Sequence, residues 1–276
     1  RTKEKGSKKD NKERCLMPHI SFSELKIWNE CAWKHKLVYL EKIKAFQGNE
    51  YTAFGTALHS VCENLVEGNF TNGEQHFQEQ FLKELKELPK DHVLNKKLVI
   101  EMRTQGKELC QYILPALKEY FGSYELFSVE EQLFEPYKDF KETEYNFKGF
   151  IDLTVKTSDG VYHVIDWKTC SWGWDSRRKT ERMTTYQLTL YKHFFAKKHG
   201  IDPADVQTHF ALLKRTAKNN NVELFKVTSG NKKTENALKL LNKALYNLHN
   251  EKHVKNRLAC HGKFGTCEFY KTNHCT

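Results

Sequence analysis

Two aspartates and a lysine lie in neighbouring segments whose side chains alternate between apolar and polar. Asp152 interrupts the first apolar run, and Asp166 and Lys168 lie two residues apart in the second. Because strand side chains repeat every two residues, Asp166 and Lys168 share a face. If the turn is centred on Asp159, each aspartate is seven residues away from it. A regular hairpin then places the two aspartates opposite one another, with Cβ atoms about 4.5–5.5 Å apart.

Two ionised carboxylates at this separation repel, so the arrangement calls for a cation between them. Hard carboxylate oxygens suit Mg²⁺ or Mn²⁺. Such an ion polarises a phosphoryl oxygen and lowers the pKa of a bound water. Lys168 could orient or deprotonate that water and offset the charge that develops on phosphate. The pattern therefore predicts metal-dependent phosphodiester hydrolysis; its alternative is an exposed acidic pair neutralised by a surface lysine.

The elements that must position these residues follow from hydrophobic periodicity. Period-two patterns predict strands, the second and third joined by a turn, at 124–135, 145–156, 161–169, 207–213 and 222–228. Helical patterns begin at Ser21, which opens a capping signature, and recur at about 52–67, 75–88, 95–121, 181–199 and 231–257. Helices that flank a mixed central sheet predict an α/β fold.

Four segments together resemble a known family. Gly149 and Asp152, followed by Asp166 and Lys168, are similar to the core of the PD-(D/E)XK nuclease superfamily and, within it, of the RecB-like branch. That branch includes AddB-type helicase-nucleases and CRISPR-associated RecB-like exonucleases. The other similar segments, in the family's order, are an opening helix at 21–34, a G-x-x-x-H segment at 55–59 and a Q-x-x-x-Y segment at 187–191.

The resemblance implies a restriction-endonuclease-like fold and a divalent-metal-dependent DNA exonuclease acting on single strands or ends. It makes His59 a third metal ligand beside the two aspartates. It also implies a strand glutamate, for which we favour Glu130 over Glu131 because it directly follows an apolar residue. Gln187 and Tyr191, which are i,i+4 neighbours on a helix, would hold the motif lysine or a DNA phosphate.

Half of the eight cysteines form a second candidate centre. Cys260, Cys267 and Cys275 lie in a short tail. Because this tail cannot bury a hydrophobic core of its own, it needs a stabilising cross-link such as a bound metal centre. The resemblance adds Cys31, where iron–sulfur relatives place their first cluster cysteine. The C-x₆-C-x₇-C spacing here departs from the relatives' common C-x₂-C-x₅-C. We therefore expect a 4Fe–4S cluster, with tetrahedral zinc as the alternative, and unliganded thiols at Cys15, Cys62, Cys110 and Cys170.

Loops that leave the strands at 161–169 and 207–213 supply aromatic and basic side chains. Such side chains stack bases and bind phosphates of single strands. The candidate nucleic-acid-binding residues are Trp172, Trp174, Arg177, Arg178, Lys214 and Arg215. Local packing is the alternative role for the two tryptophans.

Composition limits the class of protein. The 276 residues carry a formal net charge of +10, which fits a polyanion binder, and no stretch approaches the length of a membrane-spanning helix. Without a secretion-signal pattern, we expect a soluble, cytoplasmic protein. The size also fits a virus-encoded enzyme acting in its host cell.

The composition of the N-terminal segment and the resemblance together set the expected domains. Residues 1–16 form a disordered basic arm, and 17–276 a single RecB-like nuclease domain, with a helical insertion at about 70–121, a catalytic core at about 124–230 and a C-terminal helix and cysteine tail at 231–276. The chain has no nucleotide-binding P-loop, so any motor would be a separate helicase or recombinase partner. Two alternatives remain: a non-catalytic nucleic-acid-binding module with a metal cluster, and a nuclease subunit that is active only beside such a partner.

Overall fold

The computed structural model describes residues 18–43, 47–69, 72–138, 142–262 and 265–276. The chain divides into two units. The first consists of residues 1–43, 132–149 and 235–276, and the second of residues 44–131 and 150–234. The predicted basic arm at 1–16 lies outside the described residues. Among those described, no helix has the length and apolar character needed to cross a bilayer.

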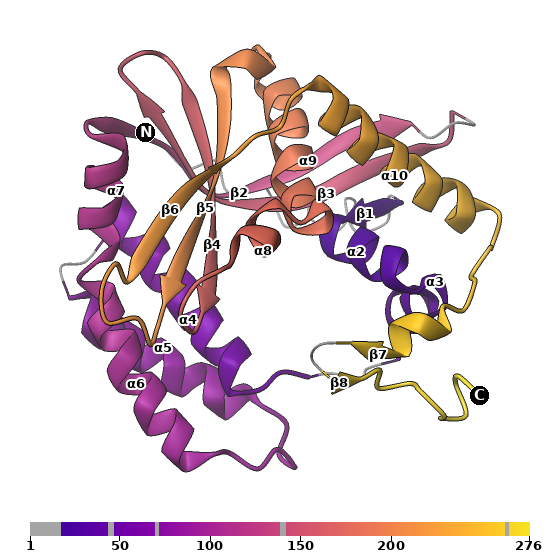
Figure 1. Cartoon of the computed structure of the whole chain (residues 1–276), viewed down its shortest axis with the longest axis horizontal. Helices are drawn as coiled ribbons and strands as arrows, with labels where there is room; N and C mark the ends of the chain where they lie inside the picture. Colours follow the sequence, from indigo (N-terminus) through magenta and orange to yellow (C-terminus); the bar gives the residue numbers. More distant parts are fainter. Residues whose placement is uncertain (1–17, 44–46, 70–71, 139–141, 263–264) are drawn as a thin grey trace, which may run out of the picture. The chain divides into compact units, whose positions relative to one another are not determined.

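The second unit contains most of a mixed β-sheet (Figure 1). Five of its six strands are β2 (Tyr124–Lys138), β3 (Glu144–Thr157), β4 (Tyr162–Cys170), β5 (Val206–Lys214) and β6 (Val222–Val227). β3 is antiparallel to β4, β4 is parallel to β5, and β5 is antiparallel to β6. β2 also pairs with β3. All five strands fall where the period-two patterns predict them.

Helices cover both faces of this part of the sheet, as the α/β prediction requires. On one face lie α4 (Glu50–Glu67), α5 (Gly73–Glu87), α6 (Lys96–Cys110) and α7 (Ile113–Phe121). They share a buried cluster with alternate side chains of the strands, among them Leu153, Ile165 and Trp167. α9 (Arg182–His199) packs on β4 and β5 outside that cluster, and the short helices α8 (Ser176–Thr180) and η2 (Pro203–Asp205) flank it.

The first unit is mainly helical. Besides the end of β2 and the start of β3, its elements are β1 (His19–Ser21), α2 (Phe22–Glu30), α3 (Ala32–His35), the π-helical turn η1 (Lys36–Leu40), most of α10 (Asn231–His249), η3 (Arg257–Cys260), β7 (His261–Gly262) and β8 (Gly265–Thr266). Ser21 caps α2, accepting a hydrogen bond from the Glu24 N–H at 3.2 Å, as its capping signature predicts. β1 pairs in parallel with the start of β3.

Two predicted helices differ from the structure. The segment 95–121 is two helices because Pro115 has no N–H and its ring would clash with the carbonyl of Gln111 in one continuous helix. Pro115 is instead accommodated in the first turn of α7. The last long helix ends at His249 rather than near Arg257, and Glu251, in the left-handed conformation with φ 53°, turns the chain away.

The close packing of α5 on α6 depends on Gly106. A Cβ atom at this position would lie 2.0 Å from Cζ of the buried Phe77 ring. We therefore expect Gly106→Ala to lower the free energy of unfolding by about 1–3 kcal/mol, because the ring cannot yield inside a packed core. Urea unfolding measures this cost. The substitution should cost less in a Phe77→Leu background, and an equal cost in both backgrounds would exclude the clash as the cause.

Candidate active site

The two motif aspartates lie where β3 and β4 stop pairing. The antiparallel ladder runs from Lys156 opposite Tyr162 to Leu153 opposite Ile165. One step further, the same register places Asp152 against Asp166, as the sequence predicts. There the Asp152 carboxylate takes the place of a backbone partner, since its Oδ2 accepts the Trp167 N–H at 2.7 Å. Asp152 and Asp166 thus lie at the first position beyond the paired part of these two strands.

Asp166 is 2% exposed and has a polar partner on each oxygen. Its Oδ1 accepts a hydrogen bond from Gln187 Nε2 at 2.7 Å, and its Oδ2 forms an ion pair with Lys168 Nζ. Gln187 Nε2 also lies 3.4 Å from the Tyr191 hydroxyl. α9 therefore brings the predicted glutamine and tyrosine to Asp166, rather than to the lysine directly.

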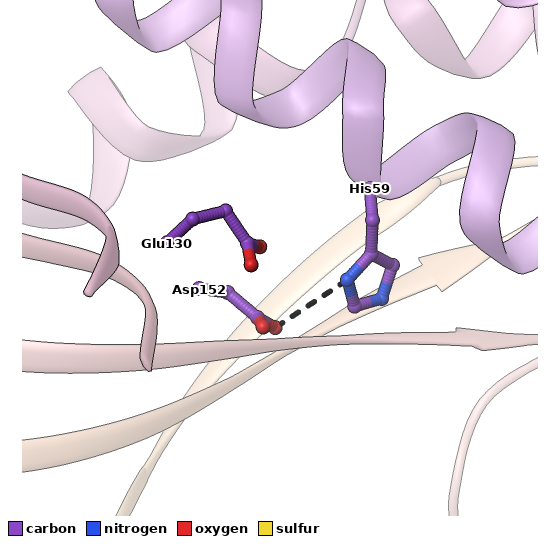
Figure 2. A group of neighbouring side chains, drawn as sticks. All are labelled: His59, Glu130 and Asp152. Carbon is purple, nitrogen blue, oxygen red and sulfur yellow. Dashed lines mark ion pairs between the residues drawn. The ribbon is translucent and has the colours of Figure 1, made fainter. Parts of the chain in front are cut away.

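A second group of side chains surrounds Asp152. His59 of α4, Glu130 of β2 and Asp152 of β3 each offer a ligand atom, and these atoms all lie within 4.8 Å of one another (Figure 2). His59 Nδ1 is 3.6 Å from Asp152 Oδ2. The three side chains line an open pocket of about 390 Å³, together with Gly55, Thr56, Ser60 and Glu63. No other trio of His, Cys, Asp or Glu in the described part of the chain is gathered so closely.

α4 reaches this pocket because its first half is built for close approach. Asn49 caps the helix, its side chain accepting the Tyr51 and Thr52 N–H groups. A Cβ at Gly55 would lie 3.3 Å from Thr169 Oγ1 of β4, so a larger residue would require the helix or the threonine side chain to shift by a few tenths of an ångström. His59 is one turn further along. The glycine of the G-x-x-x-H segment thus lets α4 pack close to β4 one turn before His59.

The structure separates the two candidate glutamates. Glu130 has φ 47°, a left-handed conformation that is uncommon for a residue with a side chain and is often found at functional sites. This kink directs Glu130 into the pocket. Glu131 points elsewhere and is held by Lys198 Nζ at 2.7 Å and His199 Nε2 at 2.6 Å. Of the two residues, only Glu130 is placed to bind the same metal ion as Asp152.

Burial and crowding shift the ionisation of His59, Glu130 and Asp152 toward the neutral forms. Burial, followed by the charge of Asp166, raises the pKa of Asp152 to about 8. Burial and Asp152 raise the pKa of Glu130 to about 7. Burial lowers the pKa of His59, leaving a neutral imidazole that can act as a ligand. Burial alone would lower the pKa of Lys168, but Asp166 and Asp152 outweigh it and the pKa is raised. A divalent cation would relieve the carboxylate repulsion, and this oxygen and nitrogen donor set fits Mg²⁺ or Mn²⁺.

Comparison with known proteins decides the family. The model of the PD-(D/E)XK nuclease superfamily matches residues 19–272. The chain belongs to this superfamily. No curated protein matches its sequence.

Several solved structures align with this superfamily member, among them two crystal structures. One is the crystal structure of a protein from Eubacterium rectale to which an exonuclease activity is ascribed. It aligns with a TM-score of 0.55 and 14% identity, over 93% of this chain and 89% of its own. The other, the protein SSO0001, aligns with a TM-score of 0.39 and 11% identity, over 87% of this chain and 82% of its own. The first supports the fold.

The four cysteines that the resemblance groups together also meet in this nuclease-superfamily chain. Cys31, Cys260, Cys267 and Cys275 line one small pocket of about 40 Å³ in the first unit. Among the described residues, no three of their sulfurs lie within 4.8 Å of one another. Four thiols around one pocket are a soft donor set that fits an iron–sulfur cluster or zinc.

The candidate nucleic-acid-binding residues divide by exposure. Trp174 is 8% exposed and packs on Phe210, with the Arg178 guanidinium 4.4 Å above its ring. Lys214 is buried, with Nζ 3.0 Å from Glu223 Oε2. Trp172 is 79% exposed, and Arg177 is exposed as well. In this conformation, stacking on bases is open to Trp172 and closed to Trp174.

Sequence reasoning did not identify Thr56, Ser60 and Glu63 as pocket residues. Thr56 and Glu63 are three residues before and four residues after His59, so helical periodicity places them on its face. Glu63 also adds negative charge near Glu130. A search for polar residues at i±3 and i±4 from the motif histidine would have found both.

Gln187 acts on the site through Asp166, so its loss has a defined expected effect. Gln187→Ala removes the donor to Asp166 Oδ1 and lets the carboxylate rotate. We expect metal-dependent cleavage to fall by about 10–100-fold, with a higher concentration of Mn²⁺ needed for half-maximal activity. A Mn²⁺ titration of the cleavage rate measures both. Tyr191→Phe, which keeps Gln187, should have a smaller effect, and an unchanged Mn²⁺ requirement in Gln187→Ala would contradict the positioning role.

Proposed function

We propose that this protein is a divalent-metal-dependent deoxyribonuclease of the RecB-like branch that removes nucleotides from single strands or DNA ends. One observation carries the proposal. The pocket that gathers His59, Glu130 and Asp152 adjoins the Asp166–Lys168 ion pair, so metal ligands and a fixed cation meet in one place. The exonuclease activity ascribed to the Eubacterium rectale protein supports this direction.

Asp152, Asp166 and His59 would hold Mg²⁺ or Mn²⁺, with Glu130 as an additional ligand. When bound, the ion would supply a Lewis acid and an activated water. The chain's own contribution centres on Lys168. Its raised pKa keeps the ammonium protonated, which favours orienting the water and offsetting charge on the phosphate over removing a proton. Gln187 fixes the orientation of Asp166.

Cleavage of an end-labelled single-stranded oligonucleotide tests the proposal. Wild type and Asp166→Ala are compared with Mn²⁺ and with EDTA. We expect cutting by wild type with Mn²⁺ alone, as a ladder that begins at one end. A circular strand of the same sequence should resist an exonuclease, and an RNA strand tests the preference for DNA. Binding without cleavage under all these conditions, including with a helicase or recombinase partner added, would overturn the proposal in favour of a binding module.

We also propose that the four pocket cysteines hold a 4Fe–4S cluster that ties the C-terminal tail to the first helices. A reducing cytoplasm would keep these residues available as ligands. Protein purified without oxygen is assayed for iron, sulfide and zinc. We expect iron and sulfide in wild type, loss of both in Cys275→Ser, and retention in Cys170→Ser, whose cysteine lies outside the pocket. Stoichiometric zinc without iron would identify the alternative, and wild type without either would refute the centre.

A further inference from the structure

Two exposed aromatic side chains and a fixed arginine lie at one end of the elements that build the pocket. Tyr51 is 51% exposed, and Trp172 is 79% exposed. The Arg215 guanidinium lies 5.5 Å from the centre of the Tyr51 ring. It also donates to Gln105 Oε1 at 2.9 Å and to Ser171 Oγ, beside Trp172, at 3.3 Å. These contacts hold the planar guanidinium in place beside a ring face.

Tyr51 and Trp172 belong to, or directly follow, the two elements α4 and β4 that carry His59 and Lys168. Tyr51 lies in the first turn of α4, eight residues before His59, which is about 12 Å along a helix. Trp172 follows the end of β4, four residues after Lys168. The contact that Gly55 permits with Thr169 keeps the start of α4 beside the end of β4. These contacts connect Tyr51, Arg215 and the loop that carries Trp172 to the two elements that carry His59 and Lys168.

The chemistry of this group selects its ligand. Single exposed aromatics are ordinary on protein surfaces, but here the rings accompany a guanidinium plane that is already ordered. Aromatic rings and arginine guanidinium planes stack on unpaired bases. Because every base has a flat π-face, this stacking does not depend on the nucleotide sequence. Arg177, exposed five residues beyond Trp172, supplies further positive charge for phosphates. Tyr, Trp and Arg are also enriched in protein–protein interfaces, so binding that depends on a base is the property that distinguishes a nucleic-acid strand from a protein partner.

We infer that Tyr51, Trp172 and Arg215 form a stacking platform for an unpaired base of a strand whose scissile phosphate occupies the metal pocket. This inference rests on the proposed nuclease function. The platform holds the strand by its bases at a fixed distance from His59, so it selects single strands over duplex. Tyr51 was not predicted from the sequence; it is assigned because the structure places Arg215 against its ring.

Binding without metal tests the platform independently of cleavage. Fluorescence anisotropy in EDTA follows a labelled thymidine oligonucleotide, intact or with one abasic position moved stepwise along it. We expect Tyr51→Ala and Trp172→Ala each to weaken binding of the intact strand by about 5- to 150-fold. Tyr51→Phe and Trp172→Phe keep a ring and should bind nearly as wild type does. A blunt duplex should be little affected by any of the four substitutions.

The abasic series gives the decisive comparison. In wild type, one or two abasic positions should weaken binding, and in the alanine variants that penalty should disappear because no ring is left to meet the base. The platform is overturned if no abasic position matters, or if the alanine variants weaken intact and abasic strands equally while melting like wild type. Normal cleavage with either result would refute the platform alone. Base-dependent binding without cleavage by wild type under any metal would refute the nuclease and leave the platform standing.

Discussion

Replacing Lys168 by methionine is expected to lower the cleavage rate by about 10²–10⁴-fold while leaving metal binding intact. Methionine keeps much of the apolar stem and removes the ammonium that forms the ion pair with Asp166. A bound metal would then be the remaining cation beside this carboxylate, so Mn²⁺ affinity should hold or increase. Single-turnover cleavage at saturating Mn²⁺, with calorimetric titration of Mn²⁺ into the same variant, separates the two effects.

Two further variants define the result. Lys168→Arg keeps the charge but changes its shape and reach, so partial activity is expected. Lys192→Met, at a half-buried lysine of α9 outside the pocket, should cleave as wild type does. If Lys168→Met lost Mn²⁺ binding together with activity, the lysine would be part of the metal site's framework, and its separate role toward the phosphate would be wrong.

The β3–β4 hairpin was predictable from the sequence because two constraints, the side-chain period and the turn length, leave a single register. A period of two fixes which side chains share a face, and a turn of known length fixes the register. Together they place Asp152 against Asp166 before any coordinates are known. α4 was equally predictable, because its apolar stripe marks the helix and Gly68 marks its C-terminal end. Side-chain periodicity, turn length and helix ends depend on residues that are close in the sequence, so the sequence predicts them most directly.

The remaining features depend on contacts between distant parts of the chain. The left-handed backbone of Glu130 is not encoded by a glycine or asparagine, so no turn signal announces it. The burial of Trp174 depends on Phe210 and Phe225, which lie on strands formed later in the chain. The pairing of β3 with β4 likewise ends next to Asp152, whose side chain accepts a backbone hydrogen bond. Each is a tertiary choice that periodicity cannot reveal.

The site's electrostatics imply that the metal-free protein sacrifices stability for function. Asp152 is almost buried beside Asp166, and its pKa is raised to about 8 from an ordinary value near 3.8. The folded protein therefore keeps a proton on Asp152 over a pH range in which the unfolded chain has lost it. Stability from this group is fully present below about pH 4 and is lost as the pH rises through about 8.

Asp152→Asn should therefore stabilise the metal-free protein at pH 8 and abolish cleavage. The amide oxygen can still accept the Trp167 N–H, but no charge is left to bury. In EDTA, the difference in the free energy of unfolding between variant and wild type should grow by up to about 1.4 kcal/mol per pH unit from pH 5 to 8. Comparing the two proteins cancels the titration of the buried histidines. Cleavage with Mn²⁺ should fall by about three orders of magnitude, since several kcal/mol of transition-state stabilisation is lost.

Urea unfolding of both proteins at pH 5, 6, 7 and 8 measures this difference. The same unfolding series with added Mn²⁺ measures how much the metal stabilises each protein. The metal should stabilise wild type most at high pH, where its carboxylates are ionised, and should stabilise the variant far less. Gln187→Ala serves as the control, because it loosens Asp166 without removing a buried charge. A variant less stable than wild type at pH 8 would mean that the Asp152 charge is already compensated within the chain. A cation would then have no imbalance to relieve, and the pocket would lose its physical reason for binding one.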